Sequence, residues 1–101
     1  MASLATFSPI WGSGFTASVT DTSGNTERGY NSRSICLTNF GSNTAYVRTG
    51  VGSGTTATTA DYPVLPQAQV TISKPNDHDY VAYVCDTGET ASLHVIPGEG
   101  M

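Results

Sequence analysis

The sequence has few charged residues, and this scarcity removes one class of partner. Among 101 residues there are four Lys and Arg and eight Asp and Glu, which gives a net charge of −4. Charged residues make up 12% of the chain, below the usual share of a globular protein. Nucleic-acid binding needs clustered cations that displace counterions, and the cations here are dispersed. We therefore expect no nucleic-acid partner.

Long hydrophobic runs and known catalytic signatures are missing as well. No stretch of the sequence is long enough to span a bilayer, and the first residues lack the basic and apolar regions of a signal peptide. We therefore expect no membrane partner. The chain has no phosphate loop ending in Lys and Ser or Thr, and no G-x-S-x-G nucleophile turn. The sequence predicts a protein that is not an enzyme and uses no cofactor.

Residues that could bind a metal or form a disulfide are sparse. The densest polar cluster, residues 76–79, reads Asn-Asp-His-Asp, and His94 is the only other histidine. A zinc site needs three or four converging ligands, whereas alternate side chains of an extended segment point to opposite faces. We interpret the cluster as a solvated turn without a metal. Cys36 and Cys85 both fall in predicted strands, where we expect two free, buried thiols.

What the sequence does contain is alternation of apolar and polar residues over short stretches bounded by turn residues. Such stretches predict β-strands, and no window has helical periodicity. The fold class predicted is all-β, an antiparallel β-sandwich or jelly-roll-like barrel of about six to seven short strands. An extended N-terminal arm, residues 1–14, precedes a single β domain, residues 15–101. The main predicted strands are Phe15–Thr20, Ser34–Asn39, Ala45–Thr49, Gln69–Ser73, Tyr80–Cys85 and Ala91–Ile96.

Two pairs of these strands are predicted to form hairpins. Tyr80–Cys85 and Ala91–Ile96 are separated by turn residues that include Gly88, and Ser34–Asn39 is followed closely by Ala45–Thr49. In the first hairpin Leu93 is expected to be buried against Val81 or Ala82. Low-complexity residues 50–59 are predicted to form a flexible surface loop.

The strand Tyr80–Cys85 is apolar on both faces, which is typical of a strand covered on both sides. In a chain this short, the second cover could come from another subunit. The alternative is that Tyr83 lies half-exposed on an ordinary surface.

The arm at residues 1–14 contains several large apolar side chains, but Pro9, Gly12 and Gly14 interrupt any regular element. It is either an extended arm that binds a neighbouring molecule or an edge strand whose Trp11 covers the core. Aromatic residues in or beside loops are common interface anchors. The candidate partner-binding residues are Leu4, Phe7, Ile10, Trp11, Tyr46, Tyr62 and Tyr83.

Three segments, AYVRTG, TTATTADYPVLP and SLHVIPGEG, give residues 34–101 a resemblance to a known family. The chain resembles the small all-β capsid decoration, or cement, proteins of tailed bacteriophages. The resemblance implies binding to the major capsid protein as a homo-oligomer, a dimer or trimer, on the capsid surface of the virion after synthesis in the host cytoplasm. No residue inherits a catalytic role from it.

A second hypothesis comes from another class of protein. A β-sandwich with aromatic loops could be a recognition module for glycans or a cell-surface receptor. This alternative requires Tyr30, Tyr46 and Tyr62 to form one patch.

Overall fold

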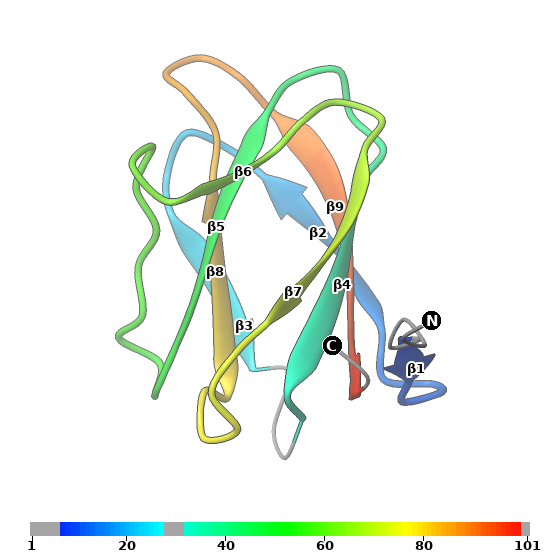
Figure 1. The fold of residues 1–101 in the computed structure, drawn as a ribbon. Helices are drawn as coiled ribbons and strands as arrows, with labels where there is room; N and C mark the ends of the chain where they lie inside the picture. Colours follow the sequence, from blue (N-terminus) through cyan, green and yellow to red (C-terminus); the bar gives the residue numbers. More distant parts are fainter. Residues whose placement is uncertain (1–6, 28–31, 100–101) are drawn as a thin grey trace.

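The computed structural model describes residues 7–27 and 32–99, which form two antiparallel β-sheets packed face to face (Figure 1). The described residues contain no helix, and hence none that is long and apolar enough to cross a membrane. The strands are β1 (Ser8–Pro9), β2 (Phe15–Val19), β3 (Gly24–Glu27), β4 (Ser34–Asn39), β5 (Ala45–Gly50), β6 (Tyr62–Val64), β7 (Gln69–Ser73), β8 (Tyr80–Val84) and β9 (Ala91–Glu99).

The order of the strands is that of a jelly roll. Sheet A contains β7, β4 and β9 in that order, with β1 and β2 both paired along the far side of β9. Sheet B has the order β3-β8-β5-β6. The pairs β2 with β9, β3 with β8, β4 with β7 and β5 with β6 make one long antiparallel ribbon that is rolled up into two sheets. The predicted all-β antiparallel sandwich is confirmed.

The two predicted hairpins are wrong. Strand β8 belongs to sheet B and β9 to sheet A, so residues 86–89 cross between the sheets (Figure 1). The turn itself forms as expected, because Gly88 takes a φ of 79° and the Glu89 amide donates to the Asp86 carbonyl oxygen over 2.9 Å. Strands β4 and β5 are likewise in different sheets. Alternation and turn residues define strands and bends, but not whether a bend closes a hairpin or links two sheets.

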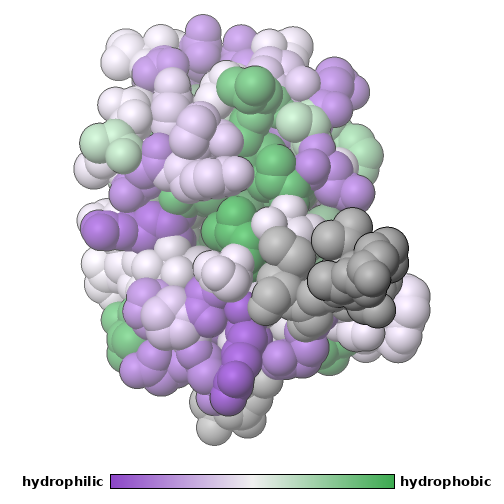
Figure 2. Space-filling view, in the orientation of Figure 1, coloured by the Kyte–Doolittle hydropathy of each residue, from purple (hydrophilic) through white to green (hydrophobic). Residues whose placement is uncertain are grey.

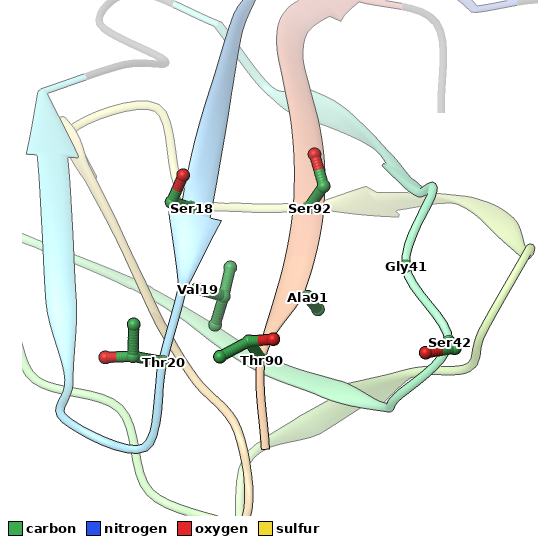
Figure 3. A pocket seen from close by; sticks show the side chains of 8 residues that line it. All are labelled: Ser18, Val19, Thr20, Gly41, Ser42, Thr90, Ala91 and Ser92. Atoms are coloured by element: carbon green, nitrogen blue, oxygen red, sulfur yellow. The ribbon is translucent and has the colours of Figure 1, made fainter. Parts of the chain in front are cut away.

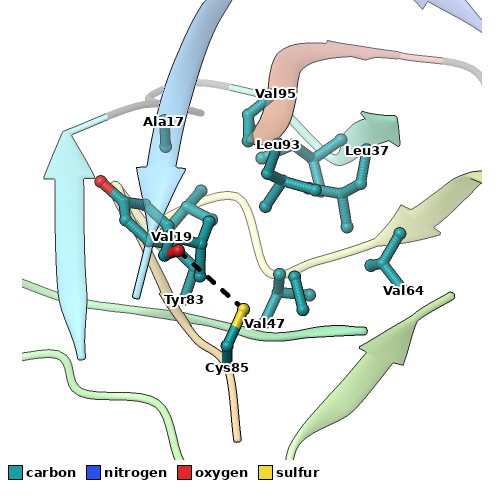
Figure 4. Close-up of a cluster of buried hydrophobic side chains, with 12 residues drawn as sticks. Ala17, Val19, Leu37, Val47, Val64, Tyr83, Cys85, Leu93 and Val95 are labelled. Carbon is teal, nitrogen blue, oxygen red and sulfur yellow. Dashed lines mark hydrogen bonds between the residues drawn. The ribbon is translucent and has the colours of Figure 1, made fainter. Parts of the chain in front are cut away.

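The core lies between the sheets and is built from the inward side chains of both (Figure 4). Leu93 is fully buried, and its register neighbours are Ala17 and Asn39 in the same sheet. Val81 belongs to the same buried cluster across the sandwich, whereas Ala82 belongs to a separate one. Leu93 is therefore a core residue as predicted, but its partners come from a different strand pairing.

Strand β8 is covered on both faces, and the chain itself supplies the second cover. Ala82 and Val84 pack with Ala57, which lies in the connection between β5 and β6. Asn25 holds this connection by donating hydrogen bonds from Nδ2 to the carbonyl oxygens of Ser53 and Thr55, both over 2.8 Å. Another subunit is therefore not needed as a cover. Residues 50–59 lie mostly at the surface, as predicted, and the burial of Ala57 and the hydrogen bonds from Asn25 hold them against sheet B.

Tyr83 is a core residue in this chain, not the exposed contact that was predicted. Its side chain is 8% exposed and faces the main core, so the expectation of a half-exposed Tyr83 is also wrong. The phenol oxygen lies 2.6 Å from Thr26 Oγ1. The hydrogen bond with Thr26 satisfies the one polar atom of the ring where β8 meets β3.

Two short strands, β3 and β6, were not foreseen, and one strand is longer than expected. Strand β3 lies in a polar stretch, and β6 contains Pro63. Strand β9 continues beyond its predicted end at Ile96 to Glu99, through Pro97 and Gly98, both of which are buried. These segments lack apolar alternation, so only their pairing with longer strands makes them extended.

Candidate functional site

The described part of the N-terminal arm begins at Phe7 and is attached to the end of β9. Ser8 and Pro9 pair with Glu99 and Gly98, and the Ile10 amide donates to the Pro97 carbonyl oxygen over 2.9 Å. Pro97 lies between the part of β9 that pairs with β1 and the part that pairs with β2. The missing N–H of a proline is tolerated at such a position. Leu4 lies outside the described residues.

Gly98 allows the arm to approach this closely. A Cβ atom at position 98 would overlap the carbonyl oxygen of Ser8 and would lie 2.6 Å from Cζ of Phe7. Phe7 is half-buried above this glycine. The absence of a side chain at residue 98 therefore makes room for both β1 and the Phe7 ring.

Beyond β1 the chain turns sharply and presents Trp11 to solvent. The Ser13 amide donates to the Ile10 carbonyl oxygen over 3.2 Å, and Gly12 takes a φ of 80°. Trp11 is 85% exposed and Ile10 is 40% exposed. Trp11 is thus not a lid on the core. It is a large apolar group on a tight turn, and β1 fastens the base of that turn to sheet A.

The two tyrosines proposed as contacts do not share a face. In the register of β5 and β6, Tyr46 is opposite Pro63 and Tyr62 is opposite Val47, so alternation places the tyrosines on opposite faces of sheet B. Tyr62 is 46% exposed. Tyr46 is half-buried, and partial burial with the nearby Asp86 carboxylate raises the pKa of its phenol. The single aromatic patch required for glycan recognition is therefore not formed by these two residues, and Tyr30 lies outside the described residues.

A pocket of about 460 Å³ opens where β2 ends and β9 begins (Figure 3). The loop after β4 forms its far wall. Five of its eight lining residues are Ser or Thr, and no charged residue lines it. The lining residues are Ser18, Val19, Thr20, Gly41, Ser42, Thr90, Ala91 and Ser92.

The far wall of this pocket is braced by two amide side chains. Gln67 donates from Nε2 to the carbonyl oxygens of Phe40 and Gly41, both over 2.9 Å. Gln67 has a φ of 61°, a left-handed conformation that is unfavourable for a residue with a side chain. The Gly41 amide in turn donates to Asn39 Oδ1 over 2.8 Å. The wall is therefore held in one position before any ligand arrives.

Three of the residues that were considered as metal ligands make separate structural contacts. His78 Nδ1 lies 2.8 Å from Thr49 Oγ1, and Asp79 accepts a hydrogen bond from the Gly52 amide over 2.9 Å. His94 Nδ1 lies 3.1 Å from Thr16 Oγ1 in sheet A. Within residues 7–27 and 32–99, no group of three or more His, Cys, Asp or Glu converges on a possible metal site.

Several exposed apolar residues were missed by the sequence analysis. Phe40 is 61% exposed, Val51 is 65% exposed and Leu65 is 59% exposed. Each lies in a connection rather than in a strand. Apolar residues in turn-rich segments could have been recognised as candidates, because such segments lie on the surface of most domains.

Comparison with known proteins does not assign this chain to a family. No family model matches the chain, and no curated protein matches it. A solved structure described as the crystal structure of PirA is similar to this chain with a TM-score of 0.49 and 14% sequence identity. The similarity covers 85% of this chain and 93% of that one. A likeness of this degree assigns no function to the chain.

Proposed function

We propose that this protein is a non-enzymatic virion structural protein that decorates a phage capsid and stabilises it by bridging major capsid protein subunits. The observation that carries the proposal is the exposure of Trp11 on a turn that β1 fastens to the body of the domain. The family resemblance of residues 34–101 supplies the identity of the partner, and a jelly roll is a fold that viral capsid domains also use.

The energetics favour Trp11 as an anchor for a protein partner. Burying an aromatic side chain removes about 150–250 Å² from water, which at about 25 cal/mol per Å² corresponds to about 4–6 kcal/mol. Ordering a free backbone costs about 1–2 kcal/mol per residue. The contacts of β1 and the Ile10–Ser13 turn already order this backbone. A partner that covers Ile10 and Trp11 together therefore retains most of the gain.

Co-sedimentation with capsids that lack the decoration protein tests this proposal. Trp11→Ala is expected to weaken binding about 30-fold or more, the effect typical of a buried aromatic anchor. Phe40→Ala, which removes an exposed aromatic from another loop, is the matched control and should bind as the wild type does. Deleting residues 2–13 should leave a folded β domain, checked by circular dichroism, that no longer sediments with capsids. Full binding by the deletion variant would refute the arm as the clamp.

The hydroxyl-lined pocket favours a second candidate function, recognition of a neutral glycan. Ser18, Ser42 and Ser92 offer donors and acceptors that match sugar hydroxyls, and the braced loop requires little reorganisation. A glycan array probed with the wild type and with Ser92→Val tests this candidate. Binding that Ser92→Val abolishes, together with no binding to capsids, would replace the first proposal with the second.

A further inference from the structure

We propose that β7 is a dimerisation edge at which two copies of this chain pair antiparallel. The two-fold axis passes through Thr71, and the two A sheets become one continuous sheet. This inference does not depend on capsid binding, because Trp11 lies in the loop between β1 and β2, at the opposite side of sheet A.

The first observation is the direction of the free backbone groups of β7. Strand β7 ends sheet A, and no strand in the described part of the chain pairs with the side of β7 that faces away from β4. The Lys74 amide donates to Arg33 and the Asn39 amide donates to Ala68, each over 2.9 Å. Backbone groups alternate along an antiparallel pair, so those of Val70 and Ile72 point at β4. Those of Gln69, Thr71 and Ser73 therefore point outward.

The second observation is that β7 carries none of the features that usually protect an edge. In natural proteins, charged residues, proline or a bulge protect an edge strand from pairing with another chain. The sequence of β7, Gln-Val-Thr-Ile-Ser, has no charge and no proline, and its register with β4 is unbroken over five residues. In sheet B, by contrast, the edge strand β6 contains Pro63 and the edge strand β3 contains Glu27.

The third observation is a difference in side-chain burial between β7 and β2, the strand at the other edge of sheet A. Of the three inward side chains of β2, Ala17 and Val19 are 6% and 1% exposed, and Phe15 is half-buried against the core. The inward side chains of β7, Val70 and Ile72, are only half-buried against the core. Figure 2 shows apolar residues gathered in a column at the centre of the face in view, which is the face on which Figure 1 draws β6 and β7. Pairing therefore adds apolar burial at both inward residues of β7, but only at the first residue of β2.

The fourth observation is that β7, when paired with β7 of a second copy, places residues of the same polarity opposite each other. Antiparallel pairing centred on Thr71 places Val70 opposite Ile72 of the second copy, Gln69 opposite Ser73, and Thr71 opposite Thr71. Every pair is apolar with apolar or polar with polar, and Thr–Thr pairs are among the favourable cross-strand pairs. A second copy of this chain is thus the occupant that the edge fits, because the same five residues supply both halves.

The oligomeric state tests this inference, and Thr71→Pro is the disrupting variant. The Thr71 amide points away from β4, so proline there leaves the ladder within the subunit intact and removes the central donor of each copy. We expect the wild type to sediment as a dimer and Thr71→Pro to sediment as a folded monomer with an unchanged circular dichroism spectrum. A wild type that stays monomeric at all concentrations, or a Thr71→Pro variant that stays dimeric, would overturn the inference.

Cross-linking tests the register without relying on a disruptive variant. Residues opposite each other in a hydrogen-bonded pair have Cα atoms about 5.5 Å apart, which suits a disulfide. Cys36 is the register partner of Thr71 on β4 and is a free thiol, so the test uses a Cys36→Ala background that excludes a disulfide within the subunit. In that background Thr71→Cys is expected to form a covalent dimer on mild oxidation. Ser18→Cys, at an outward position on the other edge of sheet A, is the matched control and should remain monomeric under denaturing, non-reducing electrophoresis. Equal cross-linking of the two variants would mean that β7 is not the contact.

Discussion

Asn39 of β4 and Val64 of β6 join the two sheets through a buried hydrogen bond. Asn39 Nδ2 donates to the Val64 carbonyl oxygen over 3.0 Å and to the Asn43 carbonyl oxygen over 2.8 Å. The Asn39 side chain is 1% exposed. Asn39 Oδ1 also accepts a hydrogen bond from the Gly41 amide. The Asn39 side chain therefore satisfies backbone groups both in β6 and in the loop that lines the pocket.

Replacing this amide is expected to destabilise the fold. Asn39→Ala leaves the Gly41 amide and two carbonyl oxygens without their partner, and each buried group left unsatisfied costs about 1–3 kcal/mol. We expect the free energy of unfolding to fall by about 2–4 kcal/mol in urea titrations. Asn43→Ala removes a single bond from Nδ2 to Thr90 and is the control, with an expected loss of about 1 kcal/mol or less. Equal losses for the two variants would contradict the bridging role of Asn39.

Leu93 is a second position where the structure predicts a large loss of stability. It is fully buried between the sheets, so Leu93→Ala should lower the free energy of unfolding by about 2–5 kcal/mol. Leu65→Ala makes the same chemical change at a residue that is 59% exposed, and its effect should stay within about 0.5 kcal/mol. A melting temperature for Leu93→Ala equal to that of the wild type would show that this core is wrongly assigned.

Lys74 is a buried cation that binds backbone carbonyl oxygens at the lower end of the sandwich. Its Nζ donates to Ser32 over 2.6 Å and to His78 over 2.9 Å, and the side chain is 6% exposed. Lys74→Met keeps the aliphatic chain but removes these charge-assisted hydrogen bonds, each of which is typically worth about 1.5–3 kcal/mol. We expect Lys74→Met to unfold at lower urea concentration than the wild type at neutral pH.

The same lysine should make stability depend on alkaline pH. Burial lowers the pKa of Lys74 below its ordinary value of 10.5, against the attraction of Glu99, Asp77 and Asp79. Between the two pKa values the unfolded chain binds more protons than the folded one, so stability rises with pH in that window. Urea titrations at successive pH values should show this rise for the wild type relative to Lys74→Met. A constant difference between the two proteins would contradict the lowered pKa.

Both cysteines are free thiols, as predicted, and Cys85 should be chemically inert in the folded protein. Burial raises the pKa of its thiol, with smaller contributions from Glu89 and Asp86, and the residue is 2% exposed. The reactive thiolate is therefore scarce and shielded. Iodoacetamide should leave Cys85 unmodified in the native protein and alkylate it fully in urea, as mass spectrometry would show. A reducing agent should not change the melting curve, because no disulfide is present to break.

The positions of the longer strands could be predicted from the sequence, because each of them has one face in the core. Strands β4 and β7 have the predicted bounds, Ser34–Asn39 and Gln69–Ser73. Alternation at period two reflects this one-sided burial directly. The apolar stretch around Tyr83 also correctly indicated a strand covered on both faces.

The candidate site could be predicted only in part. The apolar arm and its Trp11 were visible as large side chains in a segment broken by proline and glycine. The exposure of Trp11 was not, because it depends on β1 being held against β9 by a glycine almost ninety residues away in the chain. The pocket could not be foreseen at all, since its lining is drawn from three separate segments and consists of common hydroxyl residues.

The sequence by itself determined which residues are extended and which side of each strand is apolar, because these are local consequences of side-chain alternation. Only the tertiary structure decided how the strands pair. The turn containing Gly88 fits a hairpin and a crossover between sheets equally well, and the choice depends on which neighbours cover Leu93 and Val81. Burial of apolar surface is a property of the whole rolled ribbon, so no window of the sequence contains enough of the partners to decide it.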